Sequence, residues 1–308
     1  MIKPRAVRPG DRIAVVSPAS PFHREELDLG IAELRRLGYE PVYDDSIFER
    51  AMFTSGPASI RAAAFMRAWK DPDVAALMAV RGGYGSVQLL PAFDAWPPEQ
   101  APKLFIGYSD NTSLLSWLTC QRGVTALHGP MLDRRLARGP DGYDRRSLVG
   151  LLQGEGAGLD FAPDGLVTIR RGEAAGLLFG GTLTQLVGSL GTPFAFDPPD
   201  DCVLFLEDVN ERPYRIDRML TQLGQSGIPA RARALVFGEM RGCEGKEGAT
   251  VLDVIREWTA GFAGPVLLGF PSGHTTGPCW TLPLGVRVRV RTSPRASLVV
   301  EESPVSLA

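Results

Sequence analysis

The chain has 308 residues, of which 44% are apolar and 22% are charged, and these proportions are typical of globular proteins. Its formal net charge is −2, from 33 basic and 35 acidic residues, so no charge excess favours nucleic acid or an anionic membrane as a partner. The length suggests two domains of about 150 residues, each large enough for a hydrophobic core.

The sequence contains no apolar run of membrane-spanning length, and Pro9-Gly10-Asp11-Arg12 interrupts the basic N-terminus where a signal-peptide core would lie. A cytoplasmic protein is the simplest interpretation. Buried free thiols are expected rather than a metal site or disulfides, because the cysteines are widely spaced and no histidine clusters near them. They are Cys120, Cys202, Cys243 and Cys279.

The first half of the sequence alternates predicted strands and helices. Residues 12–17 and 74–80 are apolar runs of strand length, and residues 25–37 have apolar side chains at helical spacing, followed by Gly38. The other predicted elements are a strand at 41–43, a helix at 58–69, a short helix through 90, a strand at 103–107 and a helix at 111–120. This alternation predicts a mostly parallel sheet with helices on both faces.

The middle of the chain is rich in glycine, proline and charge. We therefore predict an N-terminal α/β domain at 1–145, a linker at about 146–164 and a C-terminal domain at 165–308. In the second half, strands are predicted at 175–179, 202–206, 234–237 and 265–270, helices at 214–223 and 252–258, and a loop opening into a helix at 180–190. Alternating residues in the tail predict half-exposed antiparallel strands, so the second domain should be β-rich.

Ser109 lies between a predicted strand that ends at Gly107 and a helix that begins near Asn111. A sharp strand-to-helix turn exposes a side chain at the carboxyl edge of a parallel sheet, as in a nucleophile elbow. The Gly-x-Ser-x-Gly pattern is incomplete, because Asn111 replaces the second glycine. A helix cap is the alternative role for Ser109, and the local sequence alone favours it.

The segment Arg81-Gly82-Gly83-Tyr84-Gly85 also follows a predicted strand. Its glycines allow close approach of the backbone, and their N–H groups are suited to one side of an oxyanion hole. The alternatives are a tight turn or a phosphate-binding loop, although the usual phosphate-binding patterns are missing.

Histidine is the side chain best suited to act as a general base near neutral pH, and the sequence has only His23, His128 and His274. Taken alone, each is more readily explained as structural. Glu207 and the adjacent Asp208 directly follow the strand at 202–206, where a carboxylate can orient a histidine. A loop acid paired with a nearby arginine is the alternative.

Five segments, in their order and spacing, resemble the LD-carboxypeptidase family of serine peptidases, which includes murein tetrapeptide carboxypeptidases and microcin C self-immunity proteins. They are RGGYG (81–85), GYSD (107–110), HGP (128–130), LEDVNERPYRIDRML (206–220) and GH (273–274). The resemblance implies an α/β protein with an N-terminal flavodoxin-like or amidotransferase-like parallel-sheet sandwich. It also implies a C-terminal β-rich, swivelling-barrel-like α+β domain, a site between the two, and a homodimer.

The resemblance also implies roles for individual residues. The triad would be Ser109, Glu207 and His274, with Glu211 as an alternative acid; Glu207 is preferred because a strand end holds it rigidly. The oxyanion hole would use the backbone N–H of Asp110 and one from Gly82 or Gly83. Arg81 and Tyr84 are expected to contact the substrate, Arg81 as a partner for its free carboxylate. Pairing with a structural acid is the alternative role for Arg81.

The expected reaction is release of C-terminal D-alanine from a murein tetrapeptide, after diaminopimelate or lysine, with no metal or organic cofactor. One alternative is an immunity-type peptidase that cleaves aminoacyl adenylates or sulfamoyl adenylates. Such a site needs an aromatic platform, and residues 138–165 contain no tryptophan, which favours the muropeptide. The other alternative, a non-catalytic muropeptide-binding protein, has no need of a triad in register.

Overall fold

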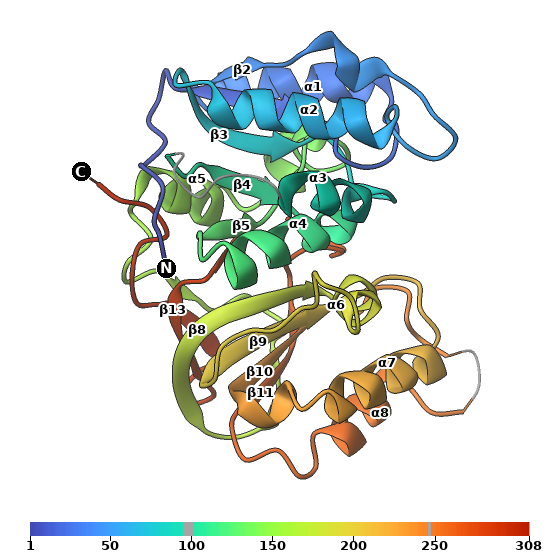
Figure 1. Ribbon diagram of the computed structural model, residues 1–308. Helices are drawn as coiled ribbons and strands as arrows, with labels where there is room; N and C mark the ends of the chain where they lie inside the picture. Colours follow the sequence, from blue (N-terminus) through green and yellow to red (C-terminus); the bar gives the residue numbers. More distant parts are fainter. Residues whose placement is uncertain (95–100, 246–247, 308) are drawn as a thin grey trace.

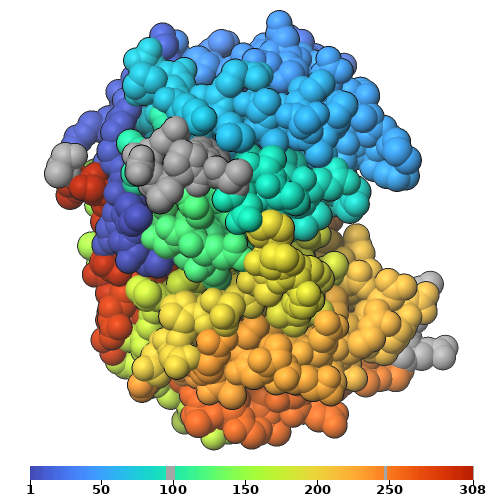
Figure 2. All heavy atoms as spheres, viewed as in Figure 1, coloured from blue at the N-terminus to red at the C-terminus, as the bar shows by residue number. Residues whose placement is uncertain are grey.

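Two β-sheets, each with its own helices, organise the chain (Figure 1). The structure is a computed structural model and describes residues 1–94, 101–245 and 248–307. The first sheet and its helices form the upper unit in Figure 1, drawn in blue to green, and the second sheet forms the lower unit. Figure 2 shows the two units in close contact.

The first sheet has the strand order β12-β5-β4-β3-β1-β2. Its parallel strands are β1 (Arg12–Val16), β2 (Glu40–Val42), β3 (Val74–Ala79), β4 (Leu104–Gly107) and β5 (Ala126–His128). Its helices are α1 (Arg24–Arg36), α2 (Ala58–Lys70), α3 (Leu90–Asp94), α4 (Thr112–Ser116) and α5 (Arg145–Gln153). The order β2-β1-β3-β4-β5 is that of flavodoxin-like sheets, and the predicted parallel-sheet sandwich is confirmed.

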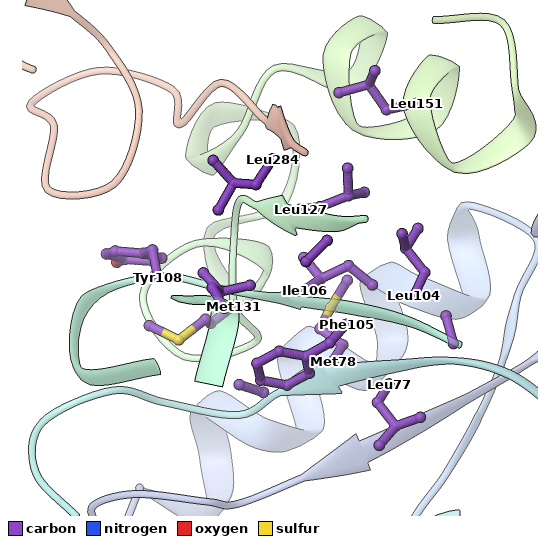
Figure 3. Close-up of a cluster of buried hydrophobic side chains, with 14 of the residues drawn as sticks. Leu77, Met78, Leu104, Phe105, Ile106, Tyr108, Leu127, Met131, Leu151 and Leu284 are labelled. Atoms are coloured by element: carbon purple, nitrogen blue, oxygen red, sulfur yellow. The ribbon is translucent and has the colours of Figure 1, made fainter. Parts of the chain in front are cut away.

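The core of this unit explains the apolar runs in the sequence. β3 and β4 are buried along their whole length, because helices cover both faces of the sheet. Figure 3 shows Met78, Phe105 and Leu127 from neighbouring strands in one cluster with Leu151 of α5 and Leu284 of β12. Burying each such side chain contributes about 1.5–3 kcal/mol relative to leaving it exposed.

Strand β12 (Leu282–Leu284) comes from the tail of the chain but pairs antiparallel with β5, with Leu282 opposite His128. The tail is predicted to form half-exposed strands of the C-terminal domain. β12 is instead fully buried and belongs to the first sheet, and the sequence could not show this because periodicity carries no information about long-range pairing. The chain therefore returns to the first sheet after passing through the second.

The second sheet has the order β6-β14-β13-β8-β9-β10-β11-β7. Its parallel centre consists of β8 (Glu173–Thr182), β9 (Cys202–Glu207), β10 (Ala232–Gly238) and β11 (Val266–Phe270). Its antiparallel strands are β6 (Asp160–Phe161), β7 (Val167–Arg170), β13 (Arg287–Arg291) and β14 (Ser297–Val300). Its helices are α6 (Leu183–Ser189), α7 (Pro213–Gln225) and α8 (Val251–Trp258).

This sheet curls into a half-barrel, with β8 curving along one side in Figure 1, and the predicted β-rich second unit is confirmed. Two local details differ from the predictions. The loop expected after residue 180 is instead the end of β8, which continues to Thr182. The segment 146–164, expected to be a linker, contains most of α5, whose Leu148 and Leu151 are fully buried, and strand β6.

In the part of the chain that the structure describes, no helix combines the length and the hydropathy that crossing a membrane requires.

Candidate active site

Ser109 occupies a strained turn directly after β4. Its backbone φ is +63°, in the left-handed region that a non-glycine residue enters at a cost of about 1–3 kcal/mol. A 3-10 turn (Ser109–Asn111) and then α4 follow. The capping alternative is not realised, because the Ser109 hydroxyl makes no hydrogen bond to a described residue. The strand, the strain and the following helix are the features of a nucleophile elbow.

The glycine-rich loop after β3 lies against this turn. A Cβ atom placed on Gly82 would be 2.8 Å from Ser109 Cβ and 3.0 Å from Ser109 Oγ, so only glycine permits this approach. The same point is 3.4 Å from the backbone nitrogen of Asp110. Gly83 has φ +99° and lies beside Ser20. The structure therefore brings Gly82, Ser109 and the Asp110 N–H together.

The side chain of Asp110 fastens the glycine-rich loop to the serine turn. Its carboxylate accepts hydrogen bonds from the backbone N–H of Gly85 (3.2 Å) and of Ser86 (2.8 Å), and the Ser86 hydroxyl donates to the Asp110 carbonyl (2.6 Å). Burial, the largest influence, raises the pKa of Asp110 above its usual value despite these hydrogen bonds. Sequence reasoning identified only the backbone of this residue.

Glu207, at the end of β9, holds His274. The Glu207 carboxylate accepts from His274 Nδ1 (2.8 Å) and from the His274 backbone N–H (3.0 Å). Thr182 lies opposite Glu207 in the β8–β9 register and donates its hydroxyl to the other carboxylate oxygen. Burial raises the pKa of Glu207, but the nearby histidine and these hydrogen bonds outweigh it and lower the pKa to about 2. The carboxylate is therefore ionised at neutral pH.

His274 lies in a segment that joins the two sheets. We call residues 271–281 the crossing loop, because it leaves β11 of the second sheet and enters β12 of the first. Gly273 in this loop has φ +77°, and a Cβ there would lie 2.9 Å both from Glu207 Oε2 and from His128 Cε1. Only a glycine permits Glu207 and both histidines to come this close.

The ring of Tyr108 connects the serine turn with His274. The two ring centroids are 5.1 Å apart and the rings meet edge to face at 76°. Ser109, the next residue, therefore lies at the same edge of the first sheet as the imidazole. Within the described residues no hydrogen bond joins Ser109 to His274; such bonds often tighten only when substrate binds. A further link between the units runs from the Thr182 N–H to the Thr112 hydroxyl, at 3.1 Å.

The structure also places the other residues predicted for the site, which are Glu211, Tyr84 and Arg81. Glu211 lies 3.4 Å from Arg215 in an ion pair one turn apart, so Glu207 and not Glu211 contacts His274. Tyr84 is about half exposed, with its N–H bonded to the Ser20 hydroxyl. Arg81 lies 3.4 Å from the buried Asp133, and 27% of its side chain remains exposed.

Asp133 is an unusual neighbour for a substrate-binding arginine. Among the residues that the structure describes, neither of its carboxylate oxygens has a hydrogen-bond partner, although Arg81 and Arg134 both lie 3.4 Å away. Burial, followed by the nearby Glu26, raises the pKa of Asp133 to about 7. Arg81 therefore has a structural partner, which was one of its two expected roles.

Sequence reasoning did not assign a role to three residues around the acid–base pair: His128, Thr182 and Arg135. His128 is fully buried beside Glu207, with Nδ1 3.0 Å from the Ser272 hydroxyl, and burial lowers its pKa to about 4. The sequence offered it as one of three histidines and as part of the HGP segment, without a role in the site. Thr182 and Arg135 carried no local signal, because their partners are distant in the sequence.

An elbow-like serine turn at the edge of one sheet and a histidine–carboxylate pair held by the other are features found in serine hydrolases with α/β folds. Family models describe both halves: the LD-carboxypeptidase N-terminal domain matches residues 13–129, and the C-terminal domain matches residues 175–290. The chain belongs to the LD-carboxypeptidase family.

Individual relatives agree with this assignment. A putative carboxypeptidase of Synechocystis sp. is 35% identical over 294 residues, covering 94% of each chain. The murein tetrapeptide carboxypeptidase of Pseudomonas aeruginosa is 31% identical and covers 85% of this chain and 88% of its own.

Solved structures show the same fold. The crystal structure of muramoyltetrapeptide carboxypeptidase from Oxalobacter formigenes has a TM-score of 0.83 at 27% identity, covering 96% of this chain and all of that one. Microcin C7 self-immunity protein MccF in complex with aspartyl sulfamoyl adenosine has a TM-score of 0.87 at 24% identity, covering 99% of this chain and all of that one. The second likeness concerns the fold alone.

Proposed function

We propose that this protein is a serine LD-carboxypeptidase that releases C-terminal D-alanine from a murein tetrapeptide, using Ser109, His274 and Glu207. The observation that carries the proposal is the bond from His274 Nδ1 to the ionised Glu207, at the edge where the strained Ser109 turn meets Gly82. The murein tetrapeptide carboxypeptidase among the relatives supports the substrate class.

The acid–base chemistry follows from the histidine tautomer. Because Glu207 is ionised and accepts from Nδ1, the proton of a neutral His274 lies on Nδ1 and leaves Nε2 free. Nε2 then removes the hydroxyl proton of Ser109 as Oγ attacks the carbonyl carbon before D-alanine. Glu207 stabilises the imidazolium that forms.

The reaction proceeds in two stages, formation of an ester on Ser109 and hydrolysis of that ester. The tetrahedral oxyanion accepts hydrogen bonds from the Asp110 N–H and from the Gly82–Gly83 backbone, donors of the type that contribute about 3 kcal/mol to lowering the barrier. The imidazolium gives its proton to the amine of D-alanine as the carbon–nitrogen bond breaks. His274 then takes a proton from water as the water oxygen attacks the carbonyl carbon of the Ser109 ester. The carbon–Oγ bond breaks, the imidazolium returns the proton to Ser109 Oγ, and the tripeptide leaves with a new carboxylate. The exposed part of Arg81 is assigned to the carboxylate of D-alanine.

A product assay tests this proposal directly. The protein is incubated with L-Ala-D-Glu-meso-diaminopimelate-D-Ala, and the tripeptide is followed by mass spectrometry. Ser109→Ala is expected to lower kcat at least about 10³-fold while the protein stays folded by circular dichroism. Lack of tripeptide from the folded wild type, beside a competent control enzyme, would contradict the substrate. Turnover by Ser109→Ala would remove Ser109 from its role.

An immunity-type peptidase acting on aminoacyl sulfamoyl adenylates is the second candidate. The observation that favours it is the sequence similarity to microcin C7 self-immunity protein MccF of Escherichia coli, which is 26% identical over 313 residues. The two candidates share the proposed triad and differ in what lies beyond the scissile bond. A comparison of kcat/KM on the tetrapeptide and on an aspartyl sulfamoyl adenylate distinguishes them. A larger value for the tetrapeptide is expected.

A non-catalytic muropeptide-binding protein would make no use of the Glu207–His274 bond. Covalent labelling of Ser109 by a fluorophosphonate separates this class from the two enzymes. Labelling that disappears in Ser109→Ala supports catalysis, whereas tetrapeptide binding without product at any enzyme concentration supports the binding protein.

A further inference from the structure

Arg135 is a buried arginine whose backbone is fixed to the first sheet. The segment before it is anchored at the end of β3, where the Leu132 and Asp133 N–H groups donate to the Ala79 and Val80 carbonyls (3.4 and 2.9 Å). The Arg135 N–H donates to the Asp133 carbonyl (2.7 Å), and only 4% of the residue is exposed. Its side chain therefore starts from a rigid point near the end of the strand that carries the glycine-rich loop.

The guanidinium of Arg135 binds the crossing loop on both sides of His274. Nη2 donates to the carbonyls of Gly273 and Thr275, both at 2.9 Å, and Nη1 donates to the carbonyl of Gly277 at 3.1 Å. Two of these carbonyls belong to the residues directly before and after His274. The backbone on both sides of the imidazole is thus fixed by one planar group, a geometry that a lysine ammonium cannot reproduce.

The same guanidinium also contacts the residue before the proposed nucleophile. Its Nε lies 3.4 Å from the Tyr108 hydroxyl, and its central carbon lies 6.0 Å from the centroid of the Tyr108 ring. Tyr108 in turn packs against the His274 ring. Arg135 therefore contacts both the turn that presents Ser109 and the loop that presents His274. The distance between these two segments sets the distance between the proposed nucleophile and its base.

The charge of the Arg135 guanidinium is stabilised by hydrogen bonds to carbonyl and phenol oxygens. Among the described residues no carboxylate lies within ion-pair distance of it, and its hydrogen-bond acceptors are three carbonyls and one phenol. A buried charge is costly unless its donors are satisfied, so any displacement of the carbonyls is strongly opposed. This makes the contact stiffer than one between neutral groups.

We propose that Arg135 is a positioning residue that sets the place of His274 relative to Ser109. The inference rests on the proposed roles of those two residues. Arg135 takes part in no bond change; it holds the crossing loop of the second sheet against the serine turn of the first. A misplacement of reacting groups by about 1 Å costs on the order of 10²-fold in rate, so loosening this contact is expected to lower kcat more than it changes KM.

The test uses Arg135→Ala, which leaves space for a guanidinium ion, with Arg135→Lys as the conservative variant. Arg138→Ala is the matched control, because Arg138 is exposed on the same segment. The expected result for Arg135→Ala is a kcat about 10²-fold lower, with KM little changed, per folded protein counted by circular dichroism. Added guanidinium, below denaturing concentrations, should restore kcat, whereas equal concentrations of sodium or ammonium chloride should not. Arg135→Lys should stay impaired.

A second readout does not depend on the substrate. Because the chain has only three histidines, the ¹⁵N-histidine spectrum can be assigned, and the Nδ1–H held by Glu207 gives His274 a separate proton signal. In Arg135→Ala this signal should broaden and recover with guanidinium, while the His128 signals stay in place. This spectrum also serves if Arg135→Ala folds only below the assay temperature.

Three outcomes would overturn the proposal: wild-type kcat in Arg135→Ala; a loss that merely follows the unfolded fraction; or an unchanged His274 signal. Failure of the proposed function has a different signature, because Ser109→Ala would then turn over substrate or the wild type would give no product. The His274 signal would report on Arg135 in either case.

Discussion

The two sides of the candidate site are held in different ways. Ser109 is presented by structure within the first sheet: a strained turn, the adjoining glycine-rich loop and the Asp110 carboxylate, all at the edge of that sheet. We call this the local side. Glu207 and His274 depend on β9 of the second sheet and on the crossing loop between the sheets, and we call them the long-range side. The nucleophile is thus built within one sheet, whereas the acid–base pair needs both sheets to be in place.

Among variants that keep Ser109, the largest loss is expected on the long-range side. Glu207→Gln keeps the shape of the side chain but removes the charge and disturbs the Nδ1 tautomer, so kcat is expected to fall by about 10³–10⁴-fold. Steady-state kinetics on the tetrapeptide measure the effect. Glu211→Gln, which changes an acid that pairs with Arg215 away from His274, is the control and should behave like the wild type. Equal losses in both variants would contradict the role of Glu207.

The local side can be disturbed with one methyl group. Gly82→Ala places a carbon 2.8 Å from Ser109 Cβ, so the turn must shift and kcat is expected to fall about 10²-fold. Gly188→Ala in α6 is the control, since nothing lies within 4 Å of its added carbon. Fluorophosphonate labelling rates should fall in parallel with kcat. Normal labelling and turnover in Gly82→Ala would show that the turn is not rigid.

The smallest expected effect concerns stability, and it isolates His128, which lies at the end of β5 where the two sides of the site meet. Burial lowers the pKa of His128 to about 4, whereas an unfolded histidine titrates near 6.5. Between these values the unfolded chain binds the proton and the folded chain does not, so this stabilising contribution is lost as the pH falls from about 6.5 towards 4. The loss between pH 7 and about pH 5 is expected to be about 2 kcal/mol.

His128→Asn keeps a polar group towards Ser272 and removes this titration. Urea unfolding at the two pH values measures the difference between wild type and variant. Asp133 and Asp208 also have shifted pKa values, but they are present in both proteins and cancel in that comparison. The pKa of Glu207, which His128 helps to lower to about 2, lies well below this pH range. An equal loss in both proteins would mean that the pKa of His128 is the same in the folded and unfolded states, which would contradict the effect of its burial.

The same division explains what the sequence could predict. The strand, turn and helix around Ser109 follow from an apolar run and its flanking residues, so the elbow was visible locally. Glu207 was recognisable as an acid at a strand end, and His274 became a candidate through the family resemblance. Arg135 and Thr182 were not predictable, because nothing in a neighbouring residue indicates that a side chain will meet a loop 138 residues away or a carboxylate 25 residues away. The pairing of β12 with β5 could not be predicted for the same reason.

The crossing loop has a consequence for how such proteins can be divided. A break within residues 146–164 would leave the first half without β12, exposing the edge of β5, while His274 would remain on the other piece, apart from Arg135. The two family segments are therefore not interchangeable modules. A functional chimera between relatives must take the tail and the first sheet from the same parent, because β12 pairs with β5 and Arg135 binds the crossing loop.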